Sequence, residues 1–148
     1  MRSSPSNKLR QSSNSSVERV ILPTEMVGLP QSPLYLQGIL KLEGRILPVV
    51  SLRKRFGLPP SENTAHERII IVGFEQGRVG FLVDRVDLLA KVPFSRIESA
   101  PSQIRGIDAG YLEGVADLAG RLVLLIDLAR ILSREERTQI AAPPTVDP

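Results

Sequence analysis

The sequence predicts a mostly β fold with short helices, made by duplication of one strand-rich module. Three observations support this fold class: an internal repeat, a glycine-containing turn within each copy, and apolar residues in the patterns typical of strands. The 148 residues are enough for one compact domain, or for two very small units that share a core. The chain contains no cysteine, which excludes disulfides and cysteine-type zinc sites and favours a reducing, cytoplasmic compartment.

The internal repeat joins two segments at an offset of 76 residues. Leu36–Gly57 reads LQGILKLEGRILPVVSLRKRFG, and Leu112–Ser133 reads LEGVADLAGRLVLLIDLARILS. Ordinary residue frequencies would give roughly one or two identical positions in such a comparison. The identical pairs here are Leu36/Leu112, Gly38/Gly114, Leu42/Leu118, Gly44/Gly120, Arg45/Arg121 and Leu52/Leu128.

Each copy is predicted to form a β-hairpin followed by a helical turn. Glu43–Gly44 and Ala119–Gly120 separate two apolar runs, and an X-Gly pair allows the positive φ angles of a tight hairpin turn. The arms that follow, Ile46–Val50 and Leu122–Ile126, are almost continuously apolar, as expected of strands that line a barrel interior.

The last predicted element is a helix after the second copy. Asp127 is placed as its N-cap, and Leu128, Ile131 and Leu132 form its apolar face. A charged turn at Arg134–Arg137 is expected to follow. This helix is expected to seal one end of a barrel.

A further hairpin is predicted between the two copies, with arms Arg68–Phe74 and Arg78–Val86. The end of its second arm, Val83–Val86, matches Val17–Val20, so the duplication extends upstream of the first copy. No matching hairpin precedes Val17, and we therefore predict that the first barrel is incomplete. An opened barrel leaves unpaired backbone edges, which favour self-association.

Composition divides the chain into a domain and two tails. Residues 1–16 contain seven serines, three basic residues and no acidic residue, which predicts a disordered, basic tail. Residues 141–148 are rich in proline and predict a second disordered tail. The domain at 17–140 is expected to hold a first barrel at about 17–60 and a second at about 67–140.

Charge and motifs argue against nucleic-acid binding, membrane insertion and catalysis. From residue 17 onward 16 basic residues balance 16 acidic ones, so the domain lacks the basic excess that phosphate binding requires. No apolar run approaches the roughly 20 residues that span a bilayer. His66 has no neighbouring metal-ligating cluster, and no glycine-rich phosphate loop is present, so we expect no catalytic residue, metal or cofactor. The aspartates Asp84, Asp87, Asp108, Asp117 and Asp127 fall at strand ends, turns and a cap, where aspartate is structural.

The motifs resemble the CheW family of chemotaxis coupling proteins over nearly all of residues 17–135. The corresponding segments are Val17–Val20, Leu29–Pro30, Tyr35–Gly44, Arg45–Gly57, the GFLVDRVDLL run at 80–89, and Tyr111–Leu132. The resemblance implies two packed, SH3-like barrels of five strands each and no active site. It also implies an adaptor that bridges the cytoplasmic tip of a chemoreceptor and the regulatory domain of a CheA-type histidine kinase. Two alternatives stay open: a scaffold of a pilus or surface-motility system with altered partner specificity, and a small SH3-like barrel that binds nucleic acid.

The resemblance also implies where partners bind. The implied partner-binding residues are Val17, Arg19, Val20, Lys41, Leu42, Glu43, Gly44 and Arg45. This chain has Arg19 where the family favours glutamate and Glu43 where it favours arginine, while Lys41 replaces asparagine and Ser51 replaces aspartate. If Arg19 and Glu43 face each other, their attraction is kept with reversed polarity, and the charge presented to a partner changes.

Overall fold

The computed structural model describes residues 9–10, 15–87, 92–99 and 109–141, which form two β-sheets and short helices. The first sheet has the order β2-β5-β6-β4-β3, and the second has the order β1-β9-β8-β7. The strands of the first are β2 (Ser15–Ile21), β3 (Leu36–Leu42), β4 (Arg45–Ser51), β5 (Arg68–Phe74) and β6 (Gly77–Val83). Those of the second are β1 (Leu9–Arg10), β7 (Ile97–Glu98), β8 (Leu112–Leu118) and β9 (Arg121–Asp127).

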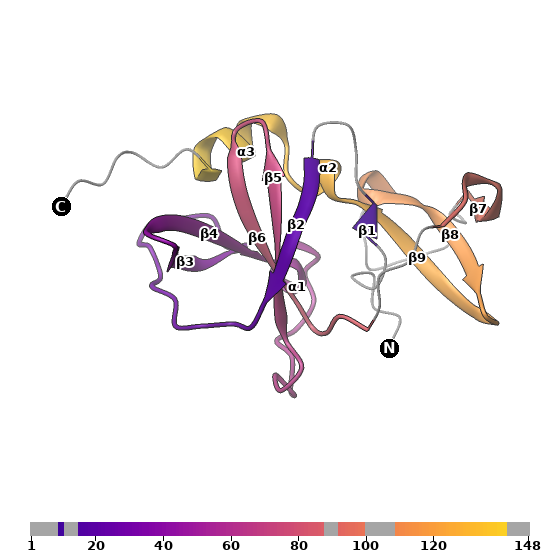
Figure 1. The fold of residues 1–148 in the computed structure, drawn as a ribbon, viewed down its shortest axis with the longest axis horizontal. Helices are drawn as coiled ribbons and strands as arrows, with labels where there is room; N and C mark the ends of the chain where they lie inside the picture. Colours follow the sequence, from indigo (N-terminus) through magenta and orange to yellow (C-terminus); the bar gives the residue numbers. More distant parts are fainter. Residues whose placement is uncertain (1–8, 11–14, 88–91, 100–108, 142–148) are drawn as a thin grey trace.

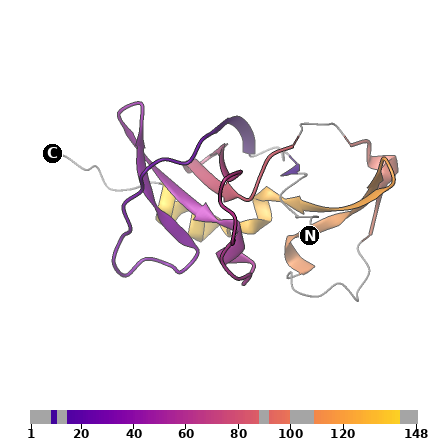
Figure 2. The same ribbon diagram turned by 90° about the horizontal axis from the view of Figure 1, so that it is seen from below.

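The helices are short. They are α1 (Leu52–Arg55), α2 (Leu128–Ile131) and α3 (Arg134–Ala141), with 3-10 turns at Phe94–Arg96 and Ala109–Tyr111. Figures 1 and 2 show the two sheets side by side, with α3 returning from the second sheet to pack against β6 and β4 of the first. The predicted mostly β class with few short helices is confirmed.

The duplication is visible in the backbone. In both hairpins, β3–β4 and β8–β9, the register shifts at the same place, between Leu36 and Gly38 and between Leu112 and Gly114. Both turns have the same left-handed pair of residues, with φ of 55° and 79° in the first and 54° and 81° in the second. Each hairpin therefore uses the tight turn that its X-Gly pair predicts.

The two hairpins also lead into helices in the same way. Ser51 and Asp127 are the N-caps of α1 and α2, and their side chains accept hydrogen bonds from the backbone N–H groups of Lys54 and Ala129. The predicted cap at Asp127 is thus confirmed. The charged segment beyond it forms α3 instead of a turn, because Ser133 and Glu136 cap its first turn with reciprocal hydrogen bonds of 2.8 and 3.0 Å.

The hairpin β5–β6 lies in the first sheet, which corrects our division of the barrels. β6 pairs with β4 in parallel at Val49–Ser51, and β5 pairs with β2. We placed this hairpin in the second barrel and expected the first to be incomplete. Within the described residues the first sheet has five strands, and the second sheet contains the two-residue strands β1 and β7.

The predicted N-terminal tail differs from the structure at four residues. Leu9 and Arg10 pair in parallel with Ile126 and Asp127 of β9, as β6 pairs with the equivalent end of β4. Ser15 and Ser16 already belong to β2. Neighbouring backbone groups offered by β9 and β5 compensate the low apolar content of these residues. The rest of the predicted tails, 1–8, 11–14 and 142–148, lies outside the described residues, and Ala141 ends α3.

Apolar side chains form an equivalent cluster on one face of each hairpin. Leu40, Leu47 and Val49 form this cluster in the first sheet, and the residues 76 positions later, Ala116, Val123 and Leu125, form it in the second. In the first sheet Ile69, Ile71 and Leu82 of the β5–β6 hairpin complete the cluster. A separate, larger cluster joins the two sheets and includes Val50 and Phe81 from the first and Ile126 and Ile131 from the second half.

Arg55 sits at the junction between the sheets. Its guanidinium lies 4.7 Å from the ring centroid of Tyr35 and 5.5 Å from that of Tyr111, two tyrosines at equivalent positions of the repeat. It also donates two hydrogen bonds, of 3.0 and 3.2 Å, to the carboxylate of Glu136 on α3. One side chain therefore connects both halves of the duplication and the last helix.

The surroundings of Arg55 change the pKa values of two side chains, Glu136 and Tyr35. Partial burial raises the pKa of Glu136, but hydrogen bonds from the Ser133 backbone and from Arg55 outweigh burial, so the pKa is lowered overall. Burial, reinforced by the neighbouring Glu136 carboxylate, raises the pKa of Tyr35. Tyr35 thus stays protonated while Glu136 stays ionised at neutral pH.

We predict that Glu136→Gln lowers the free energy of unfolding at neutral pH by about 1–2 kcal/mol, because the charge-assisted hydrogen bonds of Arg55 are lost. A carboxylate whose pKa falls on folding stabilises the fold above its unfolded pKa of about 4.3 and loses that contribution as the pH drops below it. The difference between wild type and variant should therefore shrink in acid. Urea unfolding between about pH 7 and about pH 3 measures it.

The matched control is Glu135→Gln, which removes the same charge from an exposed neighbour on α3. It should change stability by no more than about 0.5 kcal/mol at either pH. Equal losses for the two variants at neutral pH would show that Arg55 and Glu136 contribute nothing beyond general electrostatics.

We predict that Gly38→Ala destabilises the fold by about 1–3 kcal/mol, because the new methyl group overpacks a backbone crossing. A Cβ at this position would lie 2.8 Å from the carbonyl oxygen of Val27, which is hydrogen bonded to Ile39 and cannot move freely. Gly28→Ala is the control, because a Cβ there meets nothing within 4 Å. Chemical unfolding of both variants tests the prediction, and similar midpoints would contradict it.

Candidate functional site

The candidate site is centred on an ion pair between Arg19 and Glu43. The Arg19 Nη2 and Glu43 Oε2 atoms are 2.8 Å apart, and the side chains are 42% and 60% exposed. Arg19 comes from β2 and Glu43 from the β3–β4 turn, so the contact spans the two edges of the five-stranded sheet. An exposed pair of this kind contributes less than about 1 kcal/mol to stability, which leaves both side chains available to a partner.

Local structure explains why the two charges meet. Glu43 and Gly44 are the two central residues of the tight turn, and both have positive φ angles, 55° and 79°. This turn sets the position of the Glu43 side chain. On β2 the register shifts between Val17 and Arg19, so that Arg19 lies opposite Ile71 of β5. Ile71 belongs to the interior cluster of the first sheet, so Arg19 lies on the same face of the sheet as that cluster.

The other residues predicted from the sequence differ in how exposed they are and in what they pack against. Lys41 and Arg45 are exposed on either side of the turn, and Val20 is 37% exposed on β2. Leu42 is half-buried and packs beneath the pair against the first-sheet cluster. Val17 packs against the cluster between the sheets, so it supports β2 from behind and does not share a surface with Arg19.

Exposed apolar side chains gather on the segment that follows β2, and the sequence analysis missed them. Four large apolar residues in this segment are at least a third exposed: Leu22, Val27, Leu29 and Leu34. Val20, near the end of β2, is also 37% exposed. Between residues 20 and 34 Glu25 is the single charged residue, and this charge-poor, proline-rich composition was a usable signal. Apolar surface with few charges is typical of the centre of protein interfaces.

A second group that sequence reasoning missed fixes the base of α1. The Arg53 guanidinium donates two hydrogen bonds to the Asp84 carboxylate, at 2.8 and 2.9 Å, and a third to the Pro59 carbonyl. Burial raises the pKa of the adjacent Glu67, and the charge of Asp84 adds to this effect. The Asp84 carboxylate is thus held in a structural arrangement that links α1 to the end of β6.

The aspartates that could suggest hydrolytic chemistry have structural partners. Asp117 accepts a hydrogen bond from the N–H of Gly120, Asp127 caps α2, and Asp87 forms an ion pair with Arg85. Asp108 lies outside the described residues, and His66 is exposed in a loop. Among the described residues, no group of three or more His, Cys, Asp or Glu side chains is arranged to hold a metal ion. No helix of the described part is long and apolar enough to cross a membrane.

Comparison with known proteins identifies the family. The model of the CheW-like domain matches residues 12–136. The chemotaxis protein CheW of Bacillus subtilis is 34% identical over 86% of this chain and 80% of its own length. The probable chemotaxis protein CheW of Rhizobium etli is 30% identical over 76% of this chain and 73% of its own.

A solved structure agrees with the sequence relatives. The scaffolding protein TtCheW from Thermoanaerobacter tengcongensis superposes with a TM-score of 0.69 at 29% identity, covering 79% of this chain and 75% of that one. The family match at residues 12–136 includes the β2 strand and the β3–β4 turn that carry the Arg19–Glu43 pair. This chain therefore belongs to the CheW-like domain family.

Proposed function

We propose that this protein is a non-enzymatic, cytoplasmic adaptor that couples chemoreceptors to a CheA-type histidine kinase. The observation that carries the proposal is the match to the CheW-like domain over residues 12–136, and the large apolar side chains that the chain exposes support it. The relatives are named chemotaxis and scaffolding proteins. Such a protein acts by holding two partners side by side, which requires surfaces and no reactive groups.

The partner-binding surface that we propose combines charge and apolar area. Its charged part is the corner formed by Arg19, Lys41, Glu43 and Arg45, with Gly44 at its apex and Leu42 beneath it. Val20 extends the surface along β2, and Val17 holds that strand in place. Apolar contact supplies most of the binding free energy in such interfaces, and charges select among partners.

The reversed polarity of the Arg19–Glu43 pair bears on partner choice. The resemblance implies glutamate at position 19 and arginine at position 43, so the intramolecular attraction is kept while the charge at each position is inverted. A like-charge contact across an interface costs several kcal/mol. The receptor or kinase that binds this protein is therefore expected to carry matching charge changes, as in a sensory system with its own partner set.

The test is a binding experiment with purified components. The protein is combined with a CheA-type regulatory domain, with a receptor cytoplasmic tip, and with both together, and complexes are separated by size. We expect binding to each partner and a ternary complex. Failure to bind either partner, alone or combined, from a sensory system encoded with this protein would refute the adaptor role.

We predict that Glu43→Arg changes the dissociation constant for at least one of these partners by about tenfold or more, equivalent to about 1.4 kcal/mol. The variant places a second cation beside Arg19 and inverts the charge at the apex of the proposed surface. The control is Ala119→Arg at the equivalent position of the β8–β9 turn, where the backbone φ is 54° compared with 55° at Glu43. If a folded Glu43→Arg variant bound both partners with unchanged affinity, the turn would not be part of the interface.

A further inference from the structure

The duplication gives the protein two corners of the same backbone shape. The β3–β4 turn and the β8–β9 turn share their φ angles, and the residues that flank them pair in the same register, Leu42 with Arg45 and Leu118 with Arg121. A partner that recognised shape alone could dock on either corner. The side chains that differ between the corners must therefore decide which one is used.

The first corner carries a net positive charge. Its exposed charged residues are Arg19, Lys41, Glu43 and Arg45, which gives three cations and one anion, or +2. The Arg19–Glu43 pair neutralises one charge of each sign at 2.8 Å. Lys41 and Arg45 form no ion pair within the described part of the chain, so their charges face solvent. The neighbouring Glu18–Arg78 pair adds no net charge.

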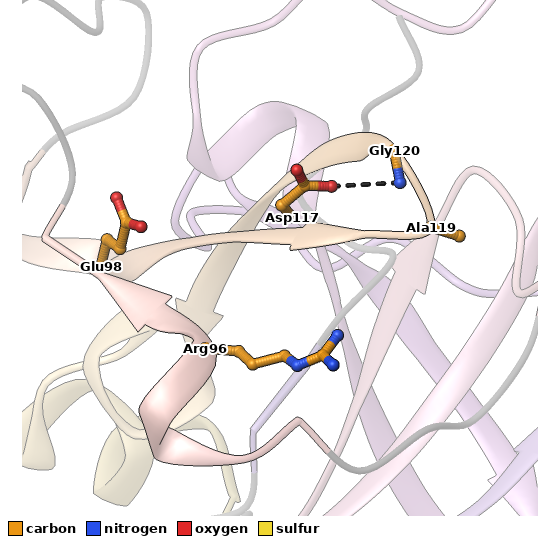
Figure 3. Close-up of a pocket in the computed structure, with 5 residues that line it drawn as sticks. All are labelled: Arg96, Glu98, Asp117, Ala119 and Gly120. Carbon is orange, nitrogen blue, oxygen red and sulfur yellow. Dashed lines mark hydrogen bonds between the residues drawn. The ribbon is translucent and has the colours of Figure 1, made fainter.

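The second corner has the same shape and, counted over the residues that the structure describes around it, no net charge. Asp117 occupies the place of Lys41 and Ala119 that of Glu43, while Arg121 repeats Arg45. A shallow hollow of about 420 Å³ lies beside this turn, lined by Arg96, Glu98, Asp117, Ala119 and Gly120. Figure 3 shows the Arg96 guanidinium lying apart from the carboxylates of Glu98 and Asp117. With Arg121 included, two cations and two anions give zero.

We propose that the first corner is the docking point for an acidic surface of a partner protein, and that charge alone directs the partner there and away from the second corner. Two unneutralised cations on a rigid turn attract a carboxylate-rich surface, raise its rate of encounter and fix its orientation. The identity of the partner as a receptor or kinase rests on the proposed function, whereas its acidic character rests on this charge difference.

A synthetic glutamate-rich helical peptide is the probe for this inference. Titrated into the isotopically labelled protein at low salt, it should shift the backbone amide signals of residues 41–45 and leave those of 117–121 unchanged. The same peptide with lysine in place of glutamate should shift neither. Raising the salt from about 50 to about 300 mM should weaken the binding, because exposed charges are screened.

Charge reversal at equivalent positions supplies the matched variants. The double substitution Lys41→Glu with Arg45→Glu should weaken peptide binding at least about tenfold. Arg121→Glu reverses the charge at the repeat equivalent of Arg45, the one cation that the two turns share, and should leave the affinity within about twofold. Equal shifts at both corners, no shift at the first corner, or equal effects of the two sets of variants would overturn the inference.

The same variants separate this inference from the proposed function. If the acidic peptide binds the first corner but neither the receptor tip nor the kinase domain binds the protein, the adaptor role fails and the charge inference stands. If those partners bind with affinities that Lys41→Glu and Arg45→Glu leave unchanged, the inference fails and the adaptor role stands.

Discussion

The first sheet depends on the parallel pairing of β4 with β6. This pairing places the β5–β6 hairpin between β4 and β2, and without it β2 would have no hydrogen-bonded connection to the β3–β4 hairpin. The close approach requires a glycine, since a Cβ on Gly80 would lie 2.7 Å from Ile69 and 3.3 Å from Leu47. This pairing brings β2 and the β3–β4 turn into one sheet, and the register shift in β2 then places Arg19 for its contact with Glu43.

The same pairing helps to join the two copies of the repeat into one fold. A hairpin from between the two copies completes the interior of the first sheet, and β1, from before the first copy, pairs with the second sheet. Each half thus includes a strand from outside its own repeat. The cluster between the sheets and the contacts of Arg55 then fix the halves against each other, which holds the two turn corners at a set separation.

Local features of the fold could be predicted from the sequence because they depend on neighbouring residues. The two hairpin turns, the cap at Asp127 and the arms of the β5–β6 hairpin all follow from turn chemistry and alternation within a few residues. The sheet to which that hairpin belongs could not be predicted. Both β4 and β9 offer an equivalent strand edge, and a choice between equivalent edges depends on contacts between residues distant in sequence.

In the candidate site, too, the local features could be predicted from the sequence, and the long-range contacts could not. The charged residues at 19 and 43 were identified from a family resemblance, and their contact depends on a register shift in β2 that no local pattern reveals. Lys41 and Arg45 could be placed beside the turn because they flank it in sequence. The partners of Arg55 could not, because α1, α3 and two tyrosines 76 residues apart meet only in the folded chain.

The contact of Arg55 with the two tyrosines has a spectroscopic consequence. Tyr35 and Tyr111 are the only tyrosines of the chain, which has no tryptophan, and both rings lie against the Arg55 guanidinium. Tyrosine fluorescence, and the tyrosine bands of the near-ultraviolet circular dichroism, therefore originate at the junction between the two sheets. These signals report, without any added label, whether the two halves of the protein remain joined.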